Sequence, residues 1–527
     1  MLTKFFHNTI AGLRQKLKPL DFEDYTIIII SILLFLYTFL NAVNADITYD
    51  EAYTFMHYSN KFSPDFLAIH MANNHPLNSF LVYLTSFLFP YNELAIRFPN
   101  LLFLCIYLVC AIGISKKFDR FKLLSFGVLC LYFFLLPNFF AQARGYGIAT
   151  ALVLYVLVRF FNEVSSERQI ISNFYILSLA SSAFTGLLPF VFILAIYYLV
   201  FHIRFNFIQF LKRNFLDLIV IGIVQLYLLY NLLHVSQENK PIYGSESPFL
   251  TSTIGYYFNS FFSFPVHFNE FILLGIFIIF IGIVLFWSIN KKTLFRITTI
   301  TTLTFLLYFI SSTISERPFI TGRLLLPLYP LIAVSFLELF NAFTLSISLK
   351  KVKLFSTLIF VSLSINYVVE SKLKLISRGH YQKAIFSDFN FDVEHKGCCS
   401  SIPFYLEKFQ YFPPVETILS NSKIVHQEID KGYTLYYDEE HAILLIEAGS
   451  KAKTAYNYHL KLVPTPQQYN SFYGNDLGKQ FMTFDWGVSS KYHAVFLPSS
   501  KIDHIYFGQY GGQGRIWERE MNLLELP

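Results

Sequence analysis

The stretch that decides the fold is TIIIISILLFLYTFLNAV at residues 26–43, followed at residues 47–53 by ITYDEAY. The first run is apolar and long enough to cross a bilayer as a helix. The acidic pair Asp50 and Glu51 therefore lies where a predicted span meets water. A carboxylate at that boundary can accept a proton from a substrate that arrives from the aqueous side. For a single acidic residue alone, a solvated loop charge would be the favoured interpretation.

The composition is that of a polytopic membrane protein. The chain is 54% hydrophobic and 14% charged, whereas soluble domains carry about 25% charged residues. The first apolar run is longer than a signal core, so we interpret it as a retained span. The net charge of +6 is modest, and its distribution predicts topology rather than nucleic-acid binding. The five cysteines show neither a disulfide framework nor the spacing of a zinc site.

Apolar runs separated by polar breaks predict an all-α membrane domain with about 11 spans. These runs are 26–43, 98–115, 123–137, 146–161, 173–187, 188–201, 215–233, 271–289, 297–313, 324–341 and 354–369. The run at 77–89 is too short to span, and we expect it to lie along the membrane surface. The boundary at 186–189 leaves open one long helix in place of two short ones.

Basic residues set the predicted orientation, because they cluster in alternate breaks. The clusters are Lys116, Lys117, Arg120 and Lys122; Arg204, Lys212 and Arg213; Lys291, Lys292 and Arg296; and Lys350, Lys351 and Lys353. The positive-inside rule assigns these breaks and the N-terminus to the cytoplasm. An odd number of spans then leaves the C-terminal tail outside.

We divide the chain into two domains. Residues 1–370 form the predicted membrane domain, whose first outer loop is 44–97. Residues 371–527 have ordinary polarity, and we expect them to form an extracytoplasmic α/β or β-rich domain. Alternating stretches at 433–437, 442–447, 492–497 and 504–507 predict strands within it.

Five short motifs fall at or near the predicted outer face. In chain order they are the acidic pair at 50–51, NHPL at 74–77, ELAIRFP at 93–99, ARGY at 143–146 and GRLLLPLYP at 322–330. In this order they resemble the GT-C superfamily of membrane glycosyltransferases, over about residues 20–340. The resemblance is to the branch of protein O-mannosyltransferases, the lipid A aminoarabinose transferase and their bacterial homologues. One departure is the absence of the second proline of the pattern: Leu77 follows Pro76 directly, and Asn78 comes next.

The resemblance implies a reaction and a location. An inverting glycosyltransferase would move a sugar from a polyprenyl-phosphate donor to an acceptor hydroxyl on a lipid, glycan or protein. It would do so at the outer face of the cell membrane of a bacterium. Asp50 would be the general base, and Glu51 would position the acceptor or assist. No cofactor is required with certainty, and a divalent metal on Asp50, Glu51 and His75 stays open.

The chemistry of such a transfer points to the same residues. A phosphate leaving group needs its developing negative charge stabilised, and arginine suits bidentate contact with phosphate. Arg144, Arg323 and Arg97 are the candidates, with Lys240 further back, and His75 and Tyr146 are further candidates for substrate binding. One carboxylate base with no enzyme nucleophile predicts a single displacement and hence inversion at the sugar carbon.

Each candidate also has a structural interpretation. Arg97 could pair with Glu93 or Asp50 instead of phosphate. Interfacial arginines such as Arg144 and Arg323 could anchor lipid headgroups, His75 could bond the loop backbone, and Tyr146 could serve packing.

Three other classes of protein compete with this interpretation. An outer-face glycan ligase or polymerase would not be expected to carry the acidic pair. A transporter or flippase of lipid-linked sugars should place ionisable residues within several spans, but the predicted spans nearly lack them. A membrane-anchored binding protein would leave Asp50 and His75 unexplained.

Overall fold

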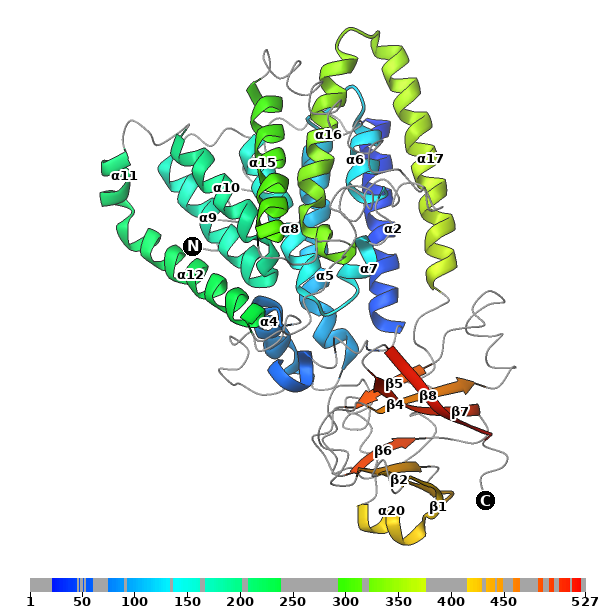
Figure 1. Cartoon of the computed structure of the whole chain (residues 1–527). Helices are drawn as coiled ribbons and strands as arrows, with labels where there is room; N and C mark the ends of the chain where they lie inside the picture. Colours follow the sequence, from blue (N-terminus) through cyan, green and yellow to red (C-terminus); the bar gives the residue numbers. More distant parts are fainter. Residues whose placement is uncertain are drawn as a thin grey trace.

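The computed structural model of the chain contains a bundle of helices and two small β-sheets (Figure 1). The structure describes residues 21–44, 47, 51, 54–59, 74–89, 92–132, 136–161, 166–200, 207–237, 292–314, 322–375, 415–428, 433–440, 443–448, 458–464, 482–486, 492–496, 502–511 and 514–522. The predicted span at 271–289 lies outside these residues.

The helices of the bundle follow the apolar runs of the sequence. They are α2 (Phe22–Asn44), η1 (Phe55–Ser59), α4 (Pro76–Ser86), α5 (Glu93–Ser115), α6 (Lys122–Cys130), α7 (Leu136–Phe140), α8 (Gly145–Phe161), α9 (Glu167–Ala183), η3 (Thr185–Leu187), α10 (Leu188–Tyr198), α11 (Phe207–Arg213), α12 (Phe215–Gln237), α15 (Lys292–Ile314), η6 (Gly322–Leu328), α16 (Tyr329–Thr344) and α17 (Leu349–Leu375). Helices α9 and α10 are separate, with η3 between them. At this boundary the sequence allowed either one long helix or two short ones.

Among the described residues, four helices are long and apolar enough to cross a membrane. They are Phe22–Val43, Glu93–Ser115, Leu324–Thr344 and Leu349–Val369. Their outer faces are apolar: α2 exposes Ile29, Leu33, Leu36 and Leu40, which are about half accessible. This spacing places all four on one side of the helix. The protein is therefore a multi-pass membrane protein.

Helices α5 and α8 pack closely against each other within the bundle, and α2, α4, α6 and α9 contact one or both of them. Helix α8 lies deep in the bundle, since Ala149 and Ala151 are fully buried although they face different sides of the helix. Gly127 of α6 lies against α17, and a Cβ at Gly127 would meet the ring of Phe360 at 2.8 Å. The core is thus built by close contact between helices.

Helix α6 ends earlier than the predicted span at 123–137. The N–H groups of Leu131 and Tyr132 both donate to the carbonyl of Gly127, at 2.7 and 3.0 Å, which closes the helix. The next described helix is α7. The last carbonyls of a helix have no partner within it, and two tyrosines from other helices supply donors. Tyr107 of α5 donates to the carbonyl of Leu129 at 2.6 Å, and Tyr329 of α16 donates to that of Val128.

The two ends of the bundle differ in chemistry. We call the end with α4 and the first turns of α5 and α8 the α4 end, and the end with the first turns of α2, α6 and α17 the α6 end (Figure 1). At the α6 end, Lys122 bonds Asp21 at 2.6 Å, and Lys353 bonds Glu23 at 3.0 Å. The hydrogen bond from Lys122 lowers the pKa of the Asp21 carboxyl. These pairs join α2 to α6 and α17.

The C-terminal part of the chain forms two antiparallel sheets. The strands are β1 (Lys423–Glu428), β2 (Tyr433–Asp438), β3 (Ile443–Ala448), β4 (Tyr458–Pro464), β5 (Met482–Trp486), β6 (Tyr492–Phe496), β7 (Ile502–Gly511) and β8 (Gly514–Asn522). Their orders are β1-β2-β3-β6 and β5-β4-β7-β8. The four stretches with alternating polarity fall on β2, β3, β6 and β7.

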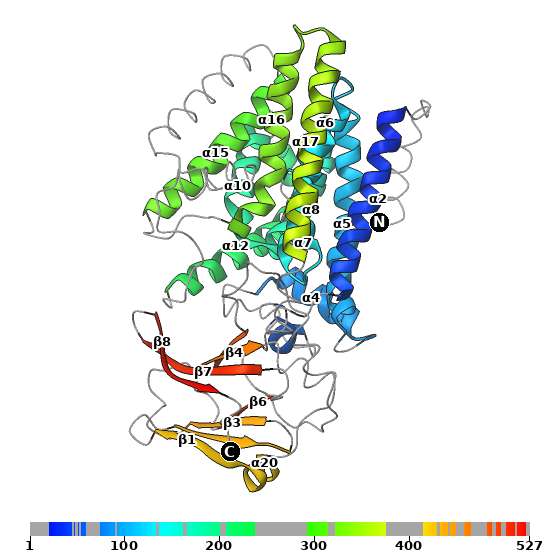
Figure 2. The ribbon, with the colours of Figure 1, turned by 90° about the vertical axis from the view of Figure 1, so that its right-hand side faces the viewer.

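Both sheets lie beyond the α4 end of the bundle, with the β5-β4-β7-β8 sheet nearer the helices (Figures 1 and 2). Helix α20 (Val415–Asn421) contacts β2 and β3. On β2, Leu435 and Tyr437 are buried, as are Thr434 and Asp438 and, on α20, Ile418. Both sheets lie at the end of the bundle that carries the buried polar residues of the candidate site.

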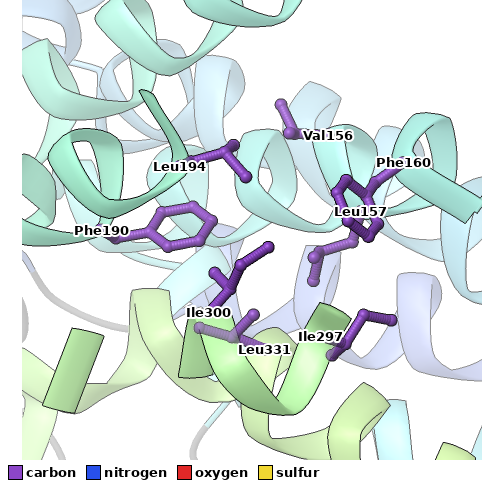
Figure 3. A pocket seen from close by; sticks show the side chains of 8 residues that line it. All are labelled: Val156, Leu157, Phe160, Phe190, Leu194, Ile297, Ile300 and Leu331. Carbon is purple, nitrogen blue, oxygen red and sulfur yellow. The ribbon is translucent and has the colours of Figure 1, made fainter. Parts of the chain in front are cut away.

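A small cavity lies inside the bundle between α8, α10, α15 and α16 (Figure 3). Its volume of about 10 Å³ holds no more than one water-sized sphere. Its lining is entirely apolar: Val156, Leu157, Phe160, Phe190, Leu194, Ile297, Ile300 and Leu331. Such a space offers a water no hydrogen-bond partner and stays dry.

Candidate functional site

A fully buried ion pair lies at the α4 end. The guanidinium of Arg97 donates from Nε to Glu51 Oε1 at 2.8 Å and from Nη2 to Oε2 at 2.9 Å. The exposed fractions are 0% for Glu51 and 1% for Arg97. Two parallel hydrogen bonds between a planar guanidinium and a carboxylate form the strongest common type of pair in proteins. The sequence offered Glu93 or Asp50 as the structural partner of Arg97; the structure shows an ion pair with Glu51, and Asp50 lies outside the described residues.

Two backbone groups complete this pair and link it to other segments. Arg97 donates from Nη1 to the carbonyl of Ala42, at the end of α2, at 2.9 Å. Glu51 Oε1 also accepts the N–H of Ala143, just before α8, at 2.6 Å. The pair therefore holds together α2, the acidic segment, α5 and the start of α8. These segments are far apart in the sequence, so no local pattern reveals the junction.

The N-terminus of α5 holds Arg97 in place. Asn92 caps this helix, because its side-chain oxygen accepts the N–H groups of Leu94 and Ala95 at 2.9 and 3.3 Å. The cap starts the helix at Glu93, before the predicted span at 98. Arg97 then lies one turn inside the helix, on a face that is buried.

Arg144 lies beside the pair, immediately after Ala143. It is 1% exposed, and its guanidinium carbon lies 5.6 Å from the centre of the Tyr146 ring. The ring of His75 meets the same Tyr146 ring edge-on at 5.0 Å. The structure thus brings together three of the residues predicted to bind substrate. A phosphate that reached Arg144 would be shielded from water, where charge-assisted hydrogen bonds are strong.

Gly145 makes this arrangement possible. A Cβ at this position would lie 1.9 Å from the carbonyl oxygen of Ala183 and 2.9 Å from the Cβ of His75. The start of α8 therefore touches the end of α9 and the start of α4 directly. Only glycine allows so close an approach.

Sequence reasoning missed a set of neutral polar residues around the pair. They are Asn74, Asn78, Ser79 and Asn100, each at most 3% exposed. Ser79 donates to Asn74 Oδ1 at 2.9 Å, and Ser59 donates to the carbonyl of Ser79 at 2.9 Å. The signal was present at two positions. Asn78 stands next to the missing second proline, and Asn100 interrupts an apolar run.

Three other predicted site residues are described in part or not at all. Asp50 falls outside the described residues, as does Lys240. Arg323 is described only through its backbone, which lies in η6, and η6 packs against α8. Among the described residues, no three His, Cys, Asp or Glu side chains gather as potential metal ligands. Both carboxylate oxygens of Glu51 face N–H donors.

The described arrangement can therefore do two things. It fixes the segment next to Asp50 against the segment that carries Arg144. It also keeps a second arginine, Arg97, neutralised by Glu51, so that the pair adds little net charge. An acid–base group at position 50 and a cation at position 144 would then work from a rigid frame.

Comparisons with known proteins give a partial likeness. No protein-family model matches the chain, and no curated protein matches it. Solved structures of ArnT from Cupriavidus metallidurans do match. The apo structure is 12% identical with a TM-score of 0.40, and the match covers 60% of this chain and 59% of that one. The structure bound to undecaprenyl phosphate is 11% identical with a TM-score of 0.39, and the match covers 60% of each chain. The chain matches about three fifths of the length of these ArnT structures.

Proposed function

We propose that the protein is an inverting glycosyltransferase of the GT-C type. It moves a sugar from a polyprenyl-phosphate donor to an acceptor hydroxyl of a lipid, glycan or protein. The reaction takes place at the α4 end of the bundle, which we assign to the outer face of the membrane. The two sheets stand over this end, and we assign them to acceptor access.

The observation that carries the proposal is the 2.6 Å hydrogen bond between Glu51 and the N–H of Ala143. Asp50 precedes Glu51 in the chain, and Arg144 follows Ala143. The contact therefore joins the residue that follows the proposed base to the residue that precedes the proposed phosphate ligand. The transfer needs a base for the acceptor and a cation for the leaving phosphate, and this contact supports both.

The roles follow from the chemistry of the transfer. Asp50 takes the proton of the acceptor hydroxyl as its oxygen attacks the anomeric carbon. The bond from that carbon to the donor phosphate breaks, and the phosphate leaves with its charge held by Arg144 and Arg323. Glu51 takes no proton in this scheme, because Arg97 and the Ala143 N–H occupy its oxygens. It holds the loop in place.

A transporter of lipid-linked sugars is the competing class. In the described membrane helices, Asp, Glu, Lys and Arg fall within the first or last two turns, apart from Glu338 of α16. Pathways for ions or polar substrates usually need such residues deeper in several spans. This distribution favours the transferase.

The test is the Asp50→Asn variant. Purified protein in detergent would receive a radiolabelled polyprenyl-phosphate sugar, and transfer to acceptor would be measured together with binding of undecaprenyl phosphate. We expect transfer to fall by about 10²–10⁴-fold, with binding retained, because only the basic carboxylate is lost. Asp46→Asn removes a carboxylate from the same loop and serves as the control. Near-normal transfer by Asp50→Asn would refute the assignment.

A further inference from the structure

Both backbone polar groups of Ala143, which belong to two successive peptides, are held by side chains. The N–H of Ala143 donates to Glu51 Oε1 at 2.6 Å, and its carbonyl accepts from Asn78 Nδ2 of α4 at 3.0 Å. Asn78 is in turn fixed from behind, because Asn100 Nδ2 of α5 donates to Asn78 Oδ1 at 2.9 Å. Both asparagines are 0% exposed. An amide chain from α5 through α4 therefore ends on the peptide directly before Arg144.

The backbone after Arg144 is equally restrained. Gly145 touches the Ala183 carbonyl and His75, so the chain cannot shift toward α9 or α4. The direction of the Arg144 side chain is set by the two peptides that flank its Cα. The first, between Ala143 and Arg144, is held at its carbonyl by Asn78 and at its N–H by the carbonyl of Gln142 at 2.8 Å. The second is wedged by packing, and Glu51 holds the peptide that precedes the first.

Stability alone gives little reason for amides in this place. A buried amide loses its hydrogen bonds to water, and internal hydrogen bonds offset only part of that free-energy cost. Apolar side chains of similar size would fill the space without that loss. What an apolar side chain lacks is a donor that holds the Ala143 carbonyl in one direction.

The side-chain oxygen of Asn100 lies close to the start of α8. This Oδ1 is buried and has no hydrogen-bond partner among the described residues. It lies beside α8, where a Cβ added to Gly147 would come within 3.0 Å of it. Asn100 thus reaches the same helix start that Asn78 restrains.

We propose that Asn78 and Asn100 are positioning residues that orient the peptide before Arg144 and so set the affinity for the donor phosphate. The inference rests on the proposed function and deepens it, since it names how the phosphate ligand is aimed. Asn78 acts directly on the peptide. Asn100 acts through Asn78.

The test measures binding of undecaprenyl phosphate to the purified full-length protein in detergent. Asn78→Leu removes the donor to Ala143, and we expect binding about tenfold weaker, the equivalent of one hydrogen bond. Asn100→Leu leaves Asn78 in place without its support, and we expect a smaller loss, about two- to fivefold. The double variant should be no weaker than Asn78→Leu, because both residues act along one chain.

Asn173→Leu is the matched control. Asn173 is also 0% exposed, and it donates to the hydroxyl of Tyr198 at 2.9 Å, in the first half of α9. It should lower the unfolding temperature as a buried amide does, with binding of undecaprenyl phosphate unchanged. Weakened binding in Asn78→Leu but not in Asn173→Leu supports the inference.

Two outcomes separate the inference from the proposed function. If the unaltered protein binds undecaprenyl phosphate and Asn78→Leu binds equally well, the asparagines are only structural and the inference fails. If Asn78→Leu does not fold, equal binding by Asn100→Leu and the unaltered protein overturns it in the same way. If the unaltered protein binds no undecaprenyl phosphate, the proposed function itself fails.

Discussion

At the scale of single residues, the pair of Glu51 and Arg97 has a measurable energetic consequence. Removing one partner of a fully buried ion pair leaves the other charge uncompensated, which costs about 3–5 kcal/mol. We therefore expect Arg97→Met to destabilise the protein by about that amount. Thermal unfolding in detergent, followed by tryptophan fluorescence or circular dichroism, would measure the change.

Arg213→Met is the matched control for this experiment. Arg213 lies 3.5 Å from Glu167, and these side chains are 66% and 37% exposed. An exposed pair contributes about 0.2–1 kcal/mol at most, so the variant should unfold close to the unaltered protein. Equal losses in Arg97→Met and Arg213→Met would contradict the view that Glu51 and Arg97 anchor the loop.

The residue scale is also where sequence reasoning stopped short. Asp50, Glu51, Arg97 and Arg144 stand out in the sequence because their charges follow or begin apolar runs. Which of them pair cannot be read from spacing, because the bonds join separate helices. In the sequence, Asn78 stands out only as a departure from a motif. Its hydrogen bond to Ala143 joins separate segments and can be recognised only in the folded structure.

At the scale of elements, the early end of α6 is held by side chains from other helices. Tyr107→Phe would leave the carbonyl of Leu129 buried without its hydroxyl donor. An unsatisfied buried carbonyl costs about 1–3 kcal/mol, and we expect the unfolding temperature to fall accordingly. The comparison is Tyr25→Phe, at the half-exposed start of α2, which should have no such effect. A silent Tyr107→Phe would mean that another group satisfies Leu129.

Apolar periodicity predicted most of the described helices, but their ends were harder to predict. Helix α5 begins at Glu93 rather than 98, because Asn92 caps it and its first turn packs in the bundle. Helix α6 ends at Cys130 rather than 137, because tyrosines of α5 and α16 take the place of the next backbone donors. In both cases contacts from outside the segment decide the boundary.

At the scale of the whole molecule, the orientation in the membrane is open to a direct test. The sheets lie beyond the α4 end, and the basic residues of α6 and α17 lie at the other. The positive-inside rule then predicts that the C-terminus is outside the cytoplasm. Alkaline phosphatase fused after Pro527 should be active in cells, and a fluorescent protein that matures only in the cytoplasm should be dark.

The matched fusion point for this experiment is the basic turn between α5 and α6. A reporter joined after Lys117 is predicted to lie in the cytoplasm and should give the reverse result. A bright cytoplasmic reporter at the C-terminus would place the α4 end on the cytoplasmic side and the start of α2 outside, which is the inverse of the predicted orientation.

The junction at Glu51 has a consequence for how the chain is made. Arg97 follows Glu51 by 46 residues, and Ala143 follows it by 92. During synthesis, the Glu51 carboxylate therefore lacks the Arg97 counter-charge until α5 has been made. It lacks the Ala143 N–H until the segment before α8 has been made. A ribosome-bound chain that ends after α5 would contain both partners of the ion pair but not the Ala143 N–H that closes the junction. The site is thus completed in order, from the N-terminus onward.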